Sequence, residues 1–190
     1  MKLALFDLDN TLLPLDSDHA WLQFLVDQGI ESQDFAAKND AFYAQYQAGK
    51  LDIHEFLAFQ LKPLASHKRA QLDIWHAQFM HSIIQPAITN AALDLIAHHK
   101  AEQAECLVIT ATNSFVTRPI VKALGLEHLI ATEPEVMEGE FTGKVLGTPS
   151  FQGGKVTRLL EWLHARGGNL ESFESVCFYS DSLNDLPLLE

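Results

Sequence analysis

Phe6-Asp7-Leu8-Asp9-Asn10-Thr11 closes a short apolar run that begins at Lys2, and this stretch decides the fold. We expect Lys2 to Asp7 to form a strand that places two carboxylates, Asp7 and Asp9, at its carboxyl end. In open α/β sheets the ligand crevice lies beyond the carboxyl ends of the strands. Neighbouring carboxylates repel each other, and a hard cation such as Mg²⁺ relieves that repulsion. The stretch therefore indicates a metal site with a carboxylate nucleophile; the competing interpretation is an acidic turn after an edge strand.

The bulk composition limits the classes of protein to which the chain can belong. It has 190 residues, of which 47% are hydrophobic, and this is enough for one core with a modest insertion. The net charge of −12 repels nucleic acid and anionic membranes, so we expect neither as a partner. No uncharged stretch is long enough to cross a bilayer, and the early acidic residues interrupt the apolar part of a signal peptide. Cys106 and Cys177 are expected to be buried free thiols, which favours a reducing, cytoplasmic location.

The sequence predicts one helix after another from about Asp16 to Gln85, with no strand between them. Asp52 and Glu55 have the spacing of a capping box for a helix over residues 53–61. Residues 14–85 are therefore expected to form a helical insertion that hangs over the carboxyl edge of the first strand, in the manner of a lid. Near its end this block carries four apolar residues at helical spacing: Leu72, Trp75, Phe79 and Ile83.

From Pro86 onward the predicted elements alternate between helices and strands, a pattern that implies a parallel sheet. We predict an α/β fold with a Rossmann-like core, formed by residues 1–13 and 86–190, and a helical cap, formed by residues 14–85. Because the sequence stops part-way into a predicted helix, we expect a further strand and helix beyond Glu190. The predicted elements are helices over 89–99, 114–124 and 155–165, strands over 105–110, 129–131 and 176–180, a hairpin over 136–145 that turns at Glu138-Gly139, and a helix from Asn184 onward.

Polar and charged groups recur at the other predicted strand and helix ends. Because the carboxyl ends of parallel strands share one edge, we expect these groups to converge on Asp7 and Asp9. Carboxylates there would hold a divalent cation, and a hydroxyl, backbone amides and an ammonium would hold a phosphate beside it. The groups are Thr110 and Ala111 after the second core strand, Lys155 at a helix start, and Asp181, Asn184 and Asp185 after the last strand.

Each of these residues has a structural explanation when it is considered alone. Thr110 ends a strand, Lys155 is an ordinary solvated helix residue, and Asp181 and Asp185 suit the first turn of a helix, where the dipole stabilises acids. Gly154-Lys155 is not a P-loop, because the first glycine and the hydroxyl residue of that motif are missing. The order Asp-x-Asp-x-Thr, Thr, Lys, Asp-x-x-x-Asp is what favours a shared site.

This ordered set resembles the four motifs of the haloacid dehalogenase (HAD) superfamily of phosphatases. Asp7 to Thr11 is similar to its first motif, Thr110 to the second, Lys155 to the third and Ser180 to Asp185 to the fourth. The helical insertion resembles the type 1 (C1) cap of the phosphoserine phosphatase branch, and Glu140-Phe141-Thr142-Gly143 resembles a hairpin of that branch. The resemblance covers essentially the whole chain and implies a HAD-like fold.

The resemblance further implies a phosphomonoester hydrolase that works through an aspartyl phosphate. Asp7 is the implied nucleophile, and Asp9 the implied acid that protonates the leaving alcohol and then the base that deprotonates water. The resemblance also implies that Asp7, the Asp9 carbonyl and Asp181 bind Mg²⁺. It implies that Thr110, the Ala111 amide and Lys155 bind the phosphate. Asn184 and Asp185 are implied to orient the metal's water shell or Lys155.

The cap is expected to select the substrate. In phosphoserine phosphatases a Glu after the first motif binds the substrate ammonium and a cap Arg binds the carboxylate; Asp16 and Gln60 stand at the corresponding positions. A neutral amide replaces a bidentate guanidinium poorly, so the resemblance indicates a small phosphate ester with an amine and no carboxylate, such as histidinol phosphate. Asp18, Trp21 and Phe24 are further candidate contacts; the alternatives are cap core for the two aromatics and a helix N-cap for Asp18.

Several other functions stay open at this point. The chain is compatible with a phosphoserine phosphatase or a phosphotransferase of the same fold, or with a non-catalytic phospho-acceptor or phosphate-binding module. Receiver domains carry their acceptor Asp on a middle strand and lack a long helical insertion, so Asp7 on the first strand argues against that class. The presence of both Asp7 and Asp9 disfavours a protein that only binds. The sequence predicts no oligomeric state, and we assign no chemistry to its histidines.

Overall fold

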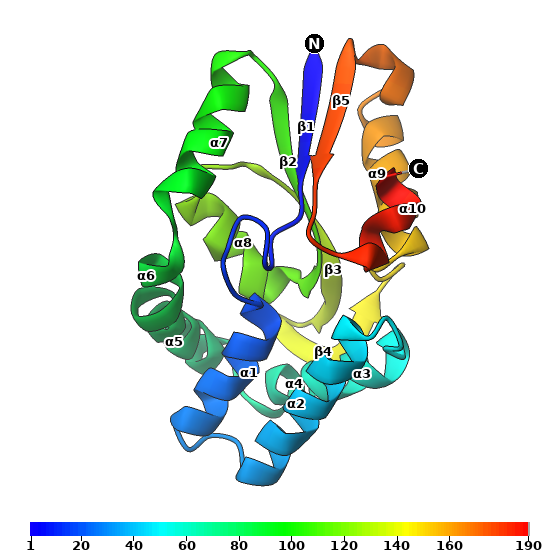
Figure 1. Ribbon diagram of the computed structural model, residues 1–190. Helices are drawn as coiled ribbons and strands as arrows, with labels where there is room; N and C mark the ends of the chain where they lie inside the picture. The colour runs from blue at the N-terminus through cyan, green and yellow to red at the C-terminus, as the bar shows by residue number, and fades with distance from the viewer. Residues whose placement is uncertain (190) are drawn as a thin grey trace.

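A five-stranded sheet forms the centre of the computed structural model, which describes residues 1–189 (Figure 1). The strand order is β4-β3-β2-β1-β5; β1, β2, β3 and β5 are parallel, and β4 runs antiparallel to β3. The predicted α/β fold with a largely parallel sheet is therefore confirmed. The strands are β1 (Lys2–Phe6), β2 (Glu105–Asn113), β3 (His128–Met137), β4 (Glu140–Leu146) and β5 (Ser175–Tyr179).

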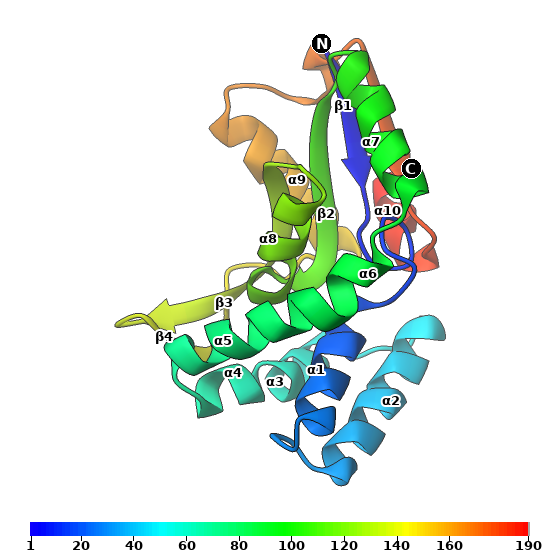
Figure 2. The same ribbon diagram turned by 90° about the vertical axis from the view of Figure 1, so that its left-hand side faces the viewer.

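The helices divide into a group beside the sheet and a group that caps one end of it (Figures 1 and 2). The first group is α7 (Asn90–Ala101), α8 (Ser114–Ala123) and α9 (Gly153–Ala165), with the short η2 (Leu170–Ser172), η3 (Leu183–Asp185) and α10 (Leu186–Leu189). The cap group is α1 (Ser17–Asp27), α2 (Gln33–Gln47), α3 (Ile53–Gln60), α4 (Lys62–Ser66), α5 (Arg69–Phe79), the π-helix η1 (Met80–Ile84) and α6 (Gln85–Ala87).

Both faces of β1 are buried, which explains its unbroken apolar sequence. Successive side chains of a strand point to opposite faces. Leu3 and Leu5 belong to the cluster that contains Leu159 of α9, whereas Phe6 belongs to the cluster that contains Ile96 of α7. β1 is thus held from both sides, and the residues that follow it start from a fixed position.

The third strand is longer than the sequence indicates. A short strand over residues 129–131 is expected, but β3 continues to Met137 and forms the predicted hairpin with β4. Pro134 and the acidic residues around it hide this continuation in the sequence, because proline within a run argues against a strand. In the structure a bulge between Pro134 and Val136 accommodates the proline. The turn at Glu138-Gly139 is confirmed, and both residues have positive φ (52° and 85°).

The predicted apolar stripe at the end of the cap is displaced by one residue. Leu72 and Phe79 are fully buried, but Ile83 is 36% exposed, and Ile84 is the buried residue instead. The π-helix η1 over Met80–Ile84 causes this shift, because a π turn contains more residues than an α turn. The prediction that this segment is helical is right, but the prediction that Ile83 lies on its buried face is wrong.

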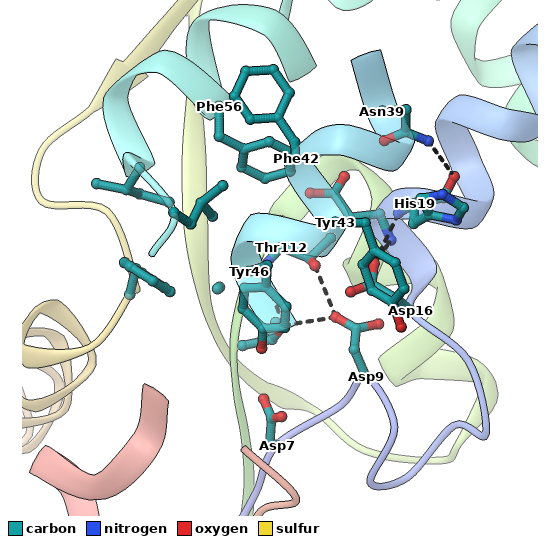
Figure 3. A pocket seen from close by; sticks show the side chains of 16 residues that line it. Asp7, Asp9, Asp16, His19, Asn39, Phe42, Tyr43, Tyr46, Phe56 and Thr112 are labelled. Atoms are coloured by element: carbon teal, nitrogen blue, oxygen red, sulfur yellow. Dashed lines mark hydrogen bonds between the residues drawn. The ribbon is translucent and has the colours of Figure 1, made fainter. Parts of the chain in front are cut away.

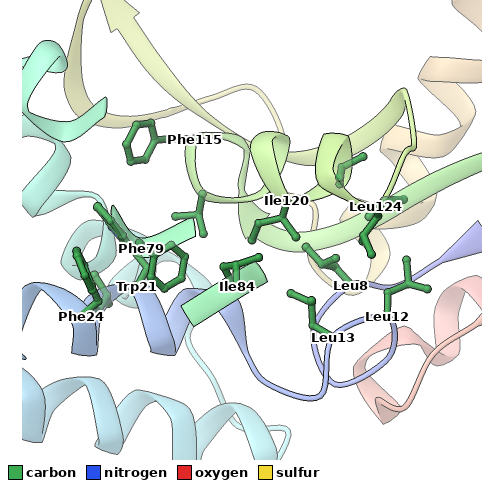
Figure 4. Close-up of a cluster of buried hydrophobic side chains, with 14 of the residues drawn as sticks. Leu8, Leu12, Leu13, Trp21, Phe24, Phe79, Ile84, Phe115, Ile120 and Leu124 are labelled. Atoms are coloured by element: carbon green, nitrogen blue, oxygen red, sulfur yellow. The ribbon is translucent and has the colours of Figure 1, made fainter. Parts of the chain in front are cut away.

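The cap and the core share one hydrophobic cluster (Figure 4). Trp21 lies at its centre, with ring centroids 5.4 Å from Phe79 of the cap and 5.7 Å from Phe115 of α8. Phe24 is buried in the same cluster. Trp21 and Phe24 are therefore cap core, and the hypothesis that they receive the substrate is wrong.

The β3–β4 hairpin attaches the cap to the core at a second place (Figure 2). The amide of Arg69 donates to Glu140 Oε2 at 2.7 Å, and the Arg69 guanidinium lies 4.7 Å from the centre of the Phe141 ring. A side chain at Gly143 would place its Cβ 3.0 Å from that of Ala65 in α4. The absence of a side chain at Gly143 lets the hairpin approach the cap closely.

Three other features of the chain bear on the sequence predictions. Cys106 and Cys177 are free thiols; Cys106 is buried and Cys177 half-buried, because β5 lies at an edge of the described sheet. The helix expected from Asn184 begins as the 3₁₀ turn η3 and continues as α10, and its predicted extension to Glu190 lies outside the described residues. No helix within residues 1–189 has the length and apolar character of a membrane span.

Candidate active site

Asp7 lies buried at the carboxyl end of β1, where β2 and β5 flank it. Its amide donates to the carbonyl of Tyr179 at 2.9 Å, which continues the β1–β5 ladder by one residue. Lys155 Nζ donates to Asp7 Oδ1 at 2.9 Å and to Asp185 Oδ2 at 2.8 Å. The structure thus brings together three predicted site residues from opposite ends of the chain around one buried ammonium.

Gly154 explains how Lys155 reaches this position. A Cβ at Gly154 would lie 2.1 Å from the carbonyl oxygen of Pro149, so only glycine fits at this position in the first turn of α9. Lys155 then follows in the first turn of the helix and is buried. The interpretation of Lys155 as a solvated surface residue is wrong.

Asp9 is held by donors from the cap and from β2, of which Figure 3 shows Thr112. The amide of Ser17 donates to Asp9 Oδ1 at 2.7 Å, and the hydroxyls of Thr112 and Thr110 donate to Oδ2 at 2.8 and 3.3 Å. Ser17 and Thr112 were not predicted from the sequence. The alternation of Thr110 and Thr112 along one strand is the signal that places both on the same face.

The two carboxyls of the first motif have raised pKa values. Burial raises the pKa of Asp7 to about 7; Lys155 opposes the rise, and Asp185 and Asp9 add to it. Burial, together with the charge of Asp16, raises the pKa of Asp9 to about 6, against the hydrogen bond from Ser17. A group that must donate and accept protons near neutral pH works best with a pKa in this range. The environment of Asp9 therefore suits it to acid–base work.

Asp181 lies on the far side of the loop that follows β1. Thr11 Oγ1 donates to Asp181 Oδ1 at 3.1 Å, and the Asp181 amide donates back to Thr11 Oγ1 at 3.2 Å. Asp181 is exposed. Burial is the main cause of the raised pKa of Asp16, and the charges of Asp7 and Asp181 both add to it, so these two carboxylates act on the same neighbouring group. The fourth motif and the first are therefore joined through Thr11.

The donor set suits a hard cation. Among residues 1–189 no three His, Cys, Asp or Glu side chains converge on one point. Both oxygens of Asp9 already accept hydrogen bonds, so Asp7 and Asp181 offer side chains and Asp9 its main-chain carbonyl. Lys155 is the one ammonium among several carboxylates here, and Mg²⁺ bound by oxygen ligands would balance the remaining charge.

Asn184 and Asp185, which are predicted to have an orienting role, are both buried. The Asn184 amide donates to the carbonyl of Tyr46 in α2 at 3.4 Å and so spans the core and the cap. Asp185 accepts from Ser180 Oγ at 2.7 Å and from Lys155. Asp185 thus fixes the ammonium whose other partner is Asp7.

A pocket between core and cap opens above Asp7 and Asp9 (Figure 3). The core supplies these acids with Thr110 and Ala111. The cap supplies an aromatic wall that the sequence analysis missed, although its four residues on α2 recur at i, i+3, i+4 and i+7. These four residues are Asn39, Phe42, Tyr43 and Tyr46, and Phe56 of α3 and Phe151 of the core complete the wall.

The free space within this pocket is small. It amounts to about 40 Å³ of room for water, which is enough for about three molecules. A phosphate ester occupies more space than this, so the structure shows the cap lying close over the site.

The predicted cap residues have different positions in this arrangement. Asp16 lines the pocket and caps α1, accepting from the amides of Asp18 and His19 at 3.0 and 2.8 Å. The helix N-cap is therefore Asp16, and the alternative that gave this role to Asp18 is wrong. Asp18 and His19 also line the pocket. Gln60 does not line it; its side-chain amide donates to Asp18 Oδ1 instead.

Comparisons with known proteins agree with this geometry. The family model described as haloacid dehalogenase-like hydrolase matches residues 4–190. The chain is 45% identical over 190 residues to a histidinol-phosphatase of Neisseria meningitidis serogroup C (strain 8013), which covers 99% of this chain and 86% of that one. A crystal structure of a protein of unknown function from Bordetella pertussis Tohama I superimposes with a TM-score of 0.93 at 46% identity, over 99% of this chain and 85% of that chain.

A structure of a phospho-aspartyl intermediate analogue of phosphoserine phosphatase shares the fold. Its TM-score is 0.67 at 21% identity, and the match covers 98% of this chain and 81% of that chain.

Proposed function

Because this chain belongs to the haloacid dehalogenase-like hydrolases, we propose that it is a Mg²⁺-dependent phosphatase that hydrolyses a small phosphate monoester through an aspartyl phosphate. The observation that carries the proposal is the pair of carboxylates, Asp7 and Asp9, at the floor of the pocket, with the buried ammonium of Lys155 on Asp7. One carboxylate is paired with an ammonium, and the other is held by three donors. This separates a nucleophile from an acid–base group within one motif.

From these contacts we propose a step for each residue. Lys155 holds Asp7 Oδ1, so Oδ2 attacks phosphorus and the bond from phosphorus to the ester oxygen breaks. Asp9 gives its proton to the departing alkoxide, and then takes a proton from the water that attacks the aspartyl phosphate. Inorganic phosphate leaves and free Asp7 returns. We propose that Thr110 and the Ala111 amide, which line the pocket, and Lys155, which contacts Asp7, stabilise the charge that gathers on the non-bridging oxygens.

Asp7, Asp181 and the main-chain carbonyl of Asp9 would hold the cation. When bound, Mg²⁺ supplies positive charge between the attacking carboxylate and the phosphate. Without the cation, the negative charge of these carboxylates would repel a phosphate, because the ammonium of Lys155 is already shared between Asp7 and Asp185.

Mg²⁺ should stabilise the protein against thermal unfolding. At a concentration 100 times its Kd, a cation that binds only the folded state adds about 2.7 kcal/mol. In Asp181→Asn the same titration should give less than half of the wild-type rise in Tm, because one ligand is lost. Asp94→Asn, an exposed carboxylate on α7, is the matched control and should keep the full rise. A wild-type Tm that does not respond to Mg²⁺ would contradict the proposed metal site.

The pocket favours an amine-bearing substrate without a carboxylate. Asp16 and Asp18 give it negative charge beside aromatic rings, and the lining within residues 1–189 contains no Lys or Arg to bind a carboxylate. The neisserial relative, named as a histidinol-phosphatase, supports the same substrate class. We therefore propose histidinol phosphate as the substrate.

A comparison of kcat/KM values tests this substrate. Histidinol phosphate should exceed phosphoserine by about 100-fold, because the carboxylate of phosphoserine meets acids in place of a partner. p-Nitrophenyl phosphate serves as the control, since it reports the phosphatase reaction without any amine. Faster hydrolysis of phosphoserine would refute the substrate while leaving the reaction class intact.

A further inference from the structure

Asp18 and Gln60 form a buried polar pair in the wall of the cap. Asp18 is 4% exposed and Gln60 is 1% exposed, and they come from α1 and α3, 42 positions apart in the sequence. The side-chain amide of Gln60 donates to Asp18 Oδ1. Asp18 lines the pocket, and the charges that act on it are those of Asp16 and Asp9. Asp18 therefore borders the pocket, and Gln60, which does not line it, contacts Asp18.

This pair has acceptors without donors. Gln60 Oε1 is buried and has no hydrogen-bond partner. In the described chain, the bond from Gln60 is the one that the Asp18 carboxylate accepts, so its second oxygen is also free. Gln60 Oε1 is withdrawn from water, and this raises the free energy of the folded state unless an N–H group reaches it.

An asparagine at position 18 would suit the fold better than the aspartate that is present. Its Oδ1 would accept from Gln60 Nε2 and its Nδ2 would donate to Gln60 Oε1, so that two amides would satisfy each other without a buried charge. Aspartate therefore serves something other than the packing of α1 against α3. Its chemistry calls for a positively charged group with several N–H donors.

We infer that Asp18, positioned by Gln60, selects the protonated amine of the substrate; this rests on the proposed function and specifies its recognition. One N–H of the ammonium meets the free oxygen of Asp18, while Gln60, which does not line the pocket, holds the other oxygen. Asp16, the residue that the family resemblance favours, uses its Oδ1 to accept two amides as the N-cap of α1, so helix capping already accounts for an aspartate at that position. Burial raises the pKa of Asp18 well above its ordinary value, and a neighbouring ammonium favours its charged form again.

Two esters that differ only in the amine test the inference. Histidinol phosphate and its deaminated analogue, 3-(imidazol-4-yl)propyl phosphate, are compared in wild type and in Asp18→Asn. The variant should lower kcat/KM for histidinol phosphate about 100-fold and change that for the analogue less than about 3-fold. Asp27→Asn, the same substitution at an exposed position of α1, should change neither value.

Thermal unfolding separates recognition from a structural role. The Tm of Asp18→Asn should equal or exceed that of wild type, and histidinol, the product amine, should raise the Tm of wild type but not of the variant. Gln60→Met, which removes both polar atoms, should weaken the same selectivity.

Two results would overturn the inference. The first is an equal loss toward both esters together with a lowered Tm in Asp18→Asn. The second is a wild type that does not distinguish the two esters and is not stabilised by histidinol. In either case hydrolysis of p-nitrophenyl phosphate shows independently whether the proposed phosphatase function holds.

Discussion

Asp7→Asn should lower kcat by at least about 10⁴-fold for every phosphate ester, because an amide cannot act as the nucleophile. The fold should survive, since Lys155 keeps its bond to Asp185 and asparagine has the size of aspartate. A buried carboxyl whose pKa is raised to about 7 lowers the stability of the free protein at neutral pH, so the variant should unfold at the same temperature or higher. Single-turnover phosphate release and thermal unfolding measure the two effects.

Asp94→Asn is the control for this variant, because it removes an exposed carboxylate from α7 and should keep full activity. Rapid denaturation during turnover should trap phosphate on the wild-type chain and none on Asp7→Asn. Residual turnover within about tenfold of wild type would remove Asp7 as the nucleophile.

Lys155→Met should lower both stability and activity. The substitution leaves the buried carboxyls of Asp7 and Asp185 without their shared cation, a change that costs about 3–5 kcal/mol when one member of a buried ion pair is removed. It also removes an ammonium from the site where the phosphate gathers charge, and kcat should fall about 10²–10³-fold. Chemical denaturation in a chelator and steady-state kinetics with Mg²⁺ measure these losses.

The stability loss in Lys155→Met should depend on pH in a defined direction. Burial already raises the pKa of Asp7 to about 7 in the presence of Lys155, and the removal of Lys155 should raise that pKa further. A carboxyl with a raised pKa in the folded state is stabilised by protonation, so the loss should be smaller at pH 5 than at pH 8. Lys122→Met, an exposed lysine on α8, should change stability by less than about 0.5 kcal/mol at either pH. A loss independent of pH would show that Lys155 does not balance these carboxyls.

The parts of the fold that were predictable from sequence are those determined by neighbouring residues. The apolar run before Asp7, the helix start at Asp52 and the turn at Glu138-Gly139 all follow from local pattern and turn chemistry. The convergence of the motifs follows from one further rule, that parallel strands share a carboxyl edge. That rule placed Lys155 and Asp185 beside Asp7 although they are far apart in sequence.

The parts that were missed depend on contacts between distant segments or on irregular backbone. The pairing of Gln60 with Asp18 joins two helices whose packing no local pattern reveals. The π-helix adds a residue without a sequence signal and exchanges Ile83 for Ile84 as the buried residue. The aromatic wall on α2 has a regular spacing, but the same spacing describes any amphipathic helix.

The small size of the enclosed pocket has a consequence for which molecules can take the phosphoryl group. In the proposed reaction, a space of this size would hold the water that hydrolyses the aspartyl phosphate and would leave little room for a second alcohol. Transfer to water would then be favoured while the cap stays in place. Glycerol or ethanol that captures the phosphoryl group would enter during an opening of the cap, so the ratio of transfer to hydrolysis would report how often the cap opens within the lifetime of the intermediate.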